Sequence, residues 1–155
     1  MFKVSAESPR RARAALALVW IAGFLMGLGI VVYVYLRGWV ERDTFLTAAK
    51  RVSDLYAPYV GAILIFYWST RADTLQFRSA RARTGAMLAL LVSVLWNVLL
   101  LVFLVPLAFG NGSLTEAMDS AGQIGGMLSW LVGGAIGFFF GTAASSATAE
   151  AEQTI

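Results

Sequence analysis

The stretch that decides the fold is AALALVWIAGFLMGLGIVVYVYL, residues 14–36, an unbroken apolar run without a charged side chain. A helix needs about 20 predominantly apolar residues to cross the roughly 30 Å hydrocarbon core of a bilayer. Arginines precede the run, as in a signal peptide, but the run is too long for one and no small-residue cleavage site follows it. We therefore expect a retained membrane span.

The composition of the whole chain agrees with this expectation. Apolar residues make up 59% of the 155 residues and charged residues only 14%, whereas soluble domains average about 45–50% apolar and about 25% charged. The chain has no Cys and no His. Disulfides, thiolate metal sites, cysteine nucleophiles and histidine bases are thereby excluded, and we expect no cofactor.

Further apolar runs predict three more spans, at about residues 55–70, 85–108 and 121–143. The chain is then an all-α integral membrane protein, a single domain of four transmembrane helices in a bundle. Pro58 is expected in the first turn of the second span, where proline is tolerated. Residues 1–13 form a basic cytoplasmic N-terminus, and the small, polar, acidic residues 144–155 are expected to be disordered.

Between the first two spans, residues 41–54 carry apolar side chains near helical spacing with charges between them. This pattern predicts an amphipathic helix that lies on the membrane surface or extends the second span outward. Ser53 or Asp54 is expected to cap the membrane part of that span.

Orientation follows from the distribution of Lys and Arg. The N-terminus and the second loop carry four each, the first loop four, and the third loop and tail none. We therefore predict that both termini are cytoplasmic, in a bacterial inner membrane. In this setting the net charge of +3 records topology, and no motif points to nucleic acid.

The strongest pattern in the sequence is a stripe of small residues in the fourth span. Close approach of helix backbones drives association in lipid, and small side chains permit it. Four residues advance a helix by about 400°, so the stripe rotates by roughly 40° per step and is expected to serve more than one neighbour. Such consecutive repeats are similar to the glycine zippers of oligomeric channels. The predicted packing or oligomer interface comprises Gly125, Ser129, Gly133, Gly137 and Gly141.

The third span carries a weaker polar face through Ser93 and Asn97. An unpaired amide at the middle of a span is costly, so Asn97 is expected to hydrogen-bond across a helix interface. The alternative is that this face lines a water-filled path.

Charged residues are scarce inside the predicted spans. Lys50 and Arg51 can pair with Asp54 at offsets of four and three, or the three can form a charged ring at a pore mouth. Asp119 and Glu116 are expected on a short external loop without obvious partners. The second loop is expected to contact anionic lipid or a cytosolic partner through Arg71, Arg78, Arg81 and Arg83.

These features favour a homo-oligomeric pore or channel-like protein. The alternative is a non-catalytic anchor or assembly subunit of a larger membrane complex, in which the glycine face receives another protein's helix. The chain is not expected to be an enzyme, because the usual acid–base and metal groups are absent. Coupled transport is disfavoured, because it usually needs an ionisable group near the middle of a span.

Overall fold

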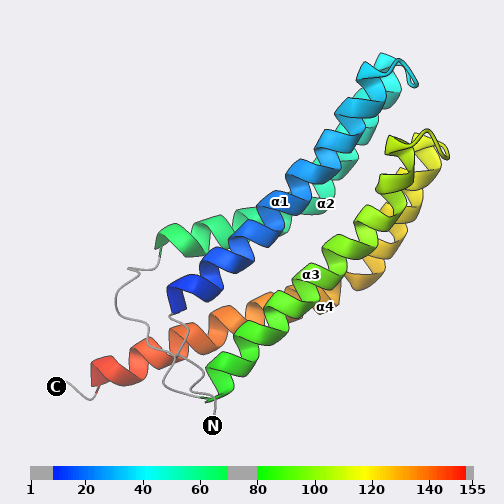
Figure 1. Cartoon of the computed structure of the whole chain (residues 1–155). Helices are drawn as coiled ribbons and strands as arrows, with labels where there is room; N and C mark the ends of the chain where they lie inside the picture. The colour runs from blue at the N-terminus through cyan, green and yellow to red at the C-terminus, as the bar shows by residue number, and fades with distance from the viewer. Residues whose placement is uncertain (1–8, 70–79, 153–155) are drawn as a thin grey trace, which may run out of the picture.

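The computed structural model describes residues 9–69 and 80–152, and the side chains of residues 12–65 and 84–138. These residues form four helices and no strand, so the predicted all-α fold is confirmed. The helices are α1 (Pro9–Leu36), α2 (Arg42–Ser69), α3 (Ala80–Ala108) and α4 (Leu114–Glu152). They run alternately up and down as two hairpins, with both hairpin turns at one end and the start of α1 and the end of α4 at the other (Figure 1).

Within the described residues, two helices are long and apolar enough to cross a membrane, α1 over Ala12–Leu36 and α3 over Thr84–Ala108. Side chains of α3 remain exposed and apolar along almost its whole length, from Met87 to Phe109 just beyond its end. A surface of this kind suits lipid rather than water.

The first half of α2 follows one of the two alternatives predicted for residues 41–54, a helix continuous with the second predicted span. Residues 42–54 continue without a break into residues 55–69, so they extend the second predicted span rather than forming a separate helix. Pro58 consequently lies in the middle of the helix and not in a first turn. Ser53 does not cap a helix start, since its hydroxyl donates to the Ala49 carbonyl oxygen at 3.0 Å within α2.

The predicted disordered tail also differs. Residues 144–152 continue α4, which is 39 residues long, and residues 153–155 lie outside the described part of the chain. The small residues of this segment are compatible with helix, and Ala in particular has the highest helix propensity.

Both apolar helices end in the same way. At the end of α1, the Gly38 amide donates to the Tyr35 carbonyl at 2.9 Å and the Trp39 amide to the Val34 carbonyl at 3.3 Å. Gly38 has a φ of 72°, in the left-handed region that glycine adopts without strain. This is a Schellman motif, which satisfies the last carbonyls of the helix and turns the chain back.

Around the bundle, α1 contacts α2 and α3, and α4 contacts α3 and α2. The interior is filled by large side chains from α1, α2 and α3, among them Trp20, Val52, Tyr56, Trp96 and Leu100, each exposed by 2% or less. One core therefore runs through both hairpins and also joins them to each other.

Candidate functional site

The centre of the bundle holds a cluster of aromatic rings with polar groups attached. Trp20 of α1 lies 5.0 Å from Trp96 of α3 and 5.9 Å from Tyr56 of α2, measured between ring centroids. Tyr59 of α2 stacks on Trp20 at 4.6 Å. These rings occupy the space where the two hairpins meet.

Two polar groups at the rim of this cluster, on Trp20 and Tyr56, bond across a helix interface. Trp20 Nε1 donates to Ser93 Oγ at 3.0 Å, and the Tyr56 hydroxyl donates to Asn97 Oδ1 at 3.0 Å. The Asn97 amide nitrogen donates to the Ser93 carbonyl oxygen at 2.8 Å within α3. The structure thus places both residues of the predicted polar face in the core, where they link α3 to α1 and α2.

Gly23 is required at this crossing by close approach. A Cβ built on Gly23 would overlap Oδ1 of Asn97 and lie 2.7 Å from its Cγ. The sequence alone assigns no particular role to Gly23. Its partner lies 74 positions away along the chain, and no local pattern reveals such a pair.

Chemically, the aromatic cluster can hold the two hairpins together through its ring contacts and its hydrogen bonds to α3. Trp96 Nε1 is buried without a hydrogen-bond partner, although its indole lies among the rings of Tyr56 and Tyr59 at 5.2 and 5.5 Å. Within the described residues, no group of three or more potential metal ligands comes together.

The second candidate site is the seam between α2 and α4, which carries charged side chains. Arg51 of α2 forms an ion pair with Asp119 of α4. Lys50 pairs with Asp54 one turn further along α2, at 2.6 Å. The expected pairing within α2 is therefore found for Lys50, whereas Arg51 crosses to the other hairpin.

Asp119 was wrongly expected on an external loop. The helix begins at Leu114, which places Glu116 in its first turn and Asp119 in its second. Ser113 precedes Glu116 by three residues, a spacing typical of a helix N-terminus, and this signal could have identified the boundary.

These charges lie alongside the apolar segment of α1. A Cβ built on Gly27 of α1 would lie 3.5 Å from Val52 of α2, so these two residues are at the same height along the bundle. Lys50 and Arg51 directly precede Val52 in α2. Gly27 is three residues past the midpoint of the apolar segment Ala12–Leu36, or about 5 Å along the axis. Lys50 and Arg51 lie one to two residues nearer the hairpin turn than Val52, so these two cations are about 6–8 Å from the middle of the apolar segment, between its middle and its turn end.

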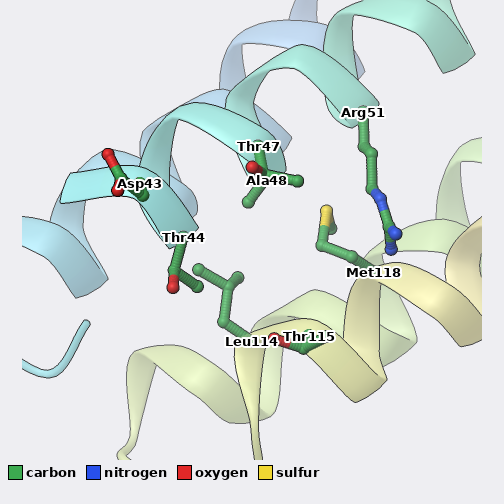
Figure 2. A pocket seen from close by; sticks show the side chains of 8 residues that line it. All are labelled: Asp43, Thr44, Thr47, Ala48, Arg51, Leu114, Thr115 and Met118. Carbon is green, nitrogen blue, oxygen red and sulfur yellow. The ribbon is translucent and has the colours of Figure 1, made fainter. Parts of the chain in front are cut away.

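A cleft of about 250 Å³ opens along the seam beside Arg51. Figure 2 shows the side chains of α2 on one wall and those of α4 on the other. The cleft is lined by Asp43, Thr44, Thr47, Ala48, Arg51, Leu114, Thr115 and Met118. A neighbouring cleft past the ion pair adds Asp54, Gly122 and Gln123. Hydroxyl, amide and charged groups thus follow one another along a single outer face of the bundle.

The glycine stripe of α4 only partly contacts the rest of the chain. Gly125 is buried, and a Cβ there would lie 3.0 Å from Leu55 Cδ2 and 3.6 Å from both Leu100 and Trp96. Ser129 is exposed, and its carbonyl accepts from the Tyr59 hydroxyl at 3.3 Å. Gly133 and Gly137 are exposed, and nothing lies within 4 Å of a Cβ built on either.

This outcome follows from the rotation of the stripe. Relative to Gly125, Gly133 and Gly137 lie about 80° and 120° further round the helix. The buried face of α4 instead follows the helical period through Met118, Ala121, Gly125, Val132 and Ala135.

The remaining predicted site residues fall where less is described. Gly141 lies in α4, and Arg81 and Arg83 lie in the first turn of α3, but the side chains around them are outside the described residues. Arg71 and Arg78 lie outside the described part of the chain. The lipid or partner contact predicted for these arginines stays a prediction.

Comparison with known proteins finds no matching family model, no matching curated protein and no matching solved structure. The function is therefore argued from the geometry alone.

Proposed function

We propose that this chain is a channel-like membrane protein whose copies surround a water-filled path lined by the polar face of α2 and α4. All four helices cross the membrane in this proposal, with both termini on the cytoplasmic side. The observation that carries it is the position of Arg51, Asp119, Lys50 and Asp54 alongside the apolar segments of α1 and α3, between their middle and their turn end.

Placing these charges against lipid is costly. Charged side chains at the centre of a membrane helix cost about 2.5–3.5 kcal/mol each on insertion scales, and in proteins they face the bundle interior or a water-filled cavity. Here the four side chains are 44–76% exposed on the single chain. They need a polar environment that the chain does not itself provide, and other copies with water between them supply it.

The path runs between chains rather than through one chain. The aromatic cluster around Trp20 and Trp96 fills the middle of the bundle. The clefts lined by Arg51 and Asp119, in contrast, open onto the outer face of α2 and α4.

The test is ion flux into liposomes that contain the purified protein. We expect salt-dependent conductance, and we expect Asp119→Asn with Arg51→Gln to change the cation-to-anion permeability ratio. Leu91→Ile, on the exposed apolar face of α3, is the matched control and should leave the ratio unchanged. Liposomes that stay impermeable to ions and small dyes, with the protein correctly inserted, would rule out the channel.

The second candidate is a non-conducting subunit of a larger membrane complex. It is favoured by the open surface at Gly133 and Gly137, which would admit a partner's helix at close range. Purification in a mild detergent separates the two proposals. A stoichiometric second protein supports the subunit, and a particle made of this chain alone supports the channel.

A further inference from the structure

The two hairpins of the chain are built on one repeating plan. The ends of α1 and α3, Leu36 and Ala108, are 72 residues apart, and so are the starts of α2 and α4, Arg42 and Leu114. The turns match as well, because Gly110 has a φ of 75° at the position equivalent to Gly38.

The backbone hydrogen bonds repeat at the same spacing. The Gly110 amide donates to the Leu107 carbonyl at 3.0 Å, and the Asn111 amide to the Pro106 carbonyl at 3.0 Å, which reproduces the two bonds that close α1. At the start of α4 the Ala117 amide donates to the Ser113 carbonyl, and at the start of α2 the Phe45 amide donates to the Glu41 carbonyl, both at 3.0 Å.

The hairpins lie side by side in the same direction. The contacts between them join α1 to α3 and α2 to α4, which are the equivalent helices. A two-fold axis along the bundle would instead bring α1 against α4 and α2 against α3. The first hairpin is therefore related to the second mainly by a sideways shift, and such a head-to-tail relation leaves a free flank at each end of the row.

The free flanks carry the same combination of large and small residues as the contact between α2 and α4 inside the chain. Within the chain, a large residue of α2 faces a small residue of α4, with Leu55 against Gly125 and Tyr59 against Ser129. The positions 72 residues after Leu55 and Tyr59 are Met127 and Leu131, both large. The positions 72 residues before Gly125 and Ser129 are Ser53 and Ala57, both small.

These flank residues are accessible and lie on the appropriate side. Met127 is 69% exposed and Ala57 is exposed, Ser53 is partly exposed, and Leu131 packs against the core while part of its side chain stays exposed. On α2, Ser53 is two residues from Leu55, which places it about 160° round the helix from the side that meets α4.

The flanks are also free of charge repulsion. The positions equivalent to Arg51 and Asp119 are Gln123 on α4 and Thr47 on α2, so a neutral pair would replace the ion pair. On α3 and α1, the positions equivalent to Gly23 and Asn97 are Leu95 and Leu25. Both side chains are apolar, and they are 48% and 59% exposed.

We propose that the partner on these flanks is a second copy of this chain, which docks its α2 flank at Ser53 and Ala57 against the α4 flank at Met127 and Leu131 of the first. Repetition of this contact continues the row of hairpins, with α1 and α3 facing lipid and α2 and α4 facing the polar side, and the row closes into a ring. The inference rests on the proposed function and specifies the interface that it needs.

Disulfide crosslinking tests the interface, because the chain has no cysteine of its own. Ser53→Cys combined with Met127→Cys should crosslink copies into a ladder on a denaturing gel, with loss of most of the monomer band and a single largest species. Each single variant alone should stay monomeric, while a mixture of the two single variants should give a dimer. Ala57→Cys with Leu131→Cys is the second pair and should give the same ladder.

The matched control is Leu55→Cys with Gly125→Cys, the equivalent pair within one chain, which should crosslink internally and give no ladder. If the control crosslinks internally while both flank pairs stay monomeric in liposomes, the interface is refuted. A dimer from one single variant alone would also refute it, because it indicates a two-fold contact. A ladder without ion conductance would support the interface and refute the channel. Conductance without a ladder would support the channel and refute this interface.

Discussion

Replacement of Gly23 by alanine should destabilise the bundle far more than a methyl group usually does. The added Cβ overlaps Oδ1 of Asn97 and comes within 3.2 Å of the Tyr56 hydroxyl oxygen. Either the α1–α3 crossing widens or Asn97 turns away and loses its bond from Tyr56. Overpacking costs about 1–3 kcal/mol and the lost hydrogen bond about 0.5–1.5 kcal/mol, while alanine returns about 0.5–1 kcal/mol of helix propensity. We expect a net loss of about 2 kcal/mol.

The assay is unfolding in dodecylmaltoside micelles with a rising fraction of SDS, followed by circular dichroism. Gly29→Ala is the control on the same helix, because nothing lies within 4 Å of a Cβ built there. It should be neutral or stabilising by up to about 1 kcal/mol.

A double-mutant cycle makes the test specific. Asn97→Ala alone should cost about 0.6–2 kcal/mol, because Tyr56 loses its acceptor. In that background Gly23→Ala should cost almost nothing, so the coupling free energy is about 2 kcal/mol. Equal effects of Gly23→Ala and Gly29→Ala, or additive effects in the cycle, would refute the close approach.

Three further outcomes are expected. Ser93→Ala leaves Trp20 Nε1 buried without its acceptor and should cost about 1–3 kcal/mol in the same unfolding assay, whereas Ser93→Thr should retain most of the stability. Gly110→Ala should cost about 1–2 kcal/mol, because a φ of 75° disfavours a Cβ, and Gly110→Asn should cost less. Gly137→Leu should leave the unfolding of the monomeric chain unchanged, since nothing lies within 4 Å, and a large loss in the monomer would show that α4 packs differently.

The helical elements were largely readable from the sequence. Long apolar runs and turn glycines are local signals, and they located α1 and α3 to within a few residues. The boundary of α2 was harder, because charged residues reduce mean hydropathy while leaving the helical period intact. The start of α4 was missed for the same reason.

The site was much less predictable. The amide of Asn97 within an apolar segment indicated that a hydrogen bond was needed. It did not identify the donor, because Tyr56 lies on another helix. The Arg51–Asp119 pair joins positions 68 residues apart, and only the register of the two hairpins brings them together. The small-residue stripe of α4 could be recognised in the sequence. Which of its glycines contact another helix depends on the rotation of a four-residue spacing around α4, and so on how α4 is oriented in the bundle.

The difference between the paired helices has a consequence for biogenesis. Helices α1 and α3 are apolar enough to leave the translocon on their own, whereas the first half of α2 carries Arg42, Asp43, Lys50, Arg51 and Asp54. We expect α2 and α4 to enter the bilayer only as the second arm of a hairpin, each beside the apolar helix synthesised immediately before it. The glycine-closed turns at Gly38 and Gly110 bring each arm back against its partner within five residues, and we expect this short connection to speed the co-insertion.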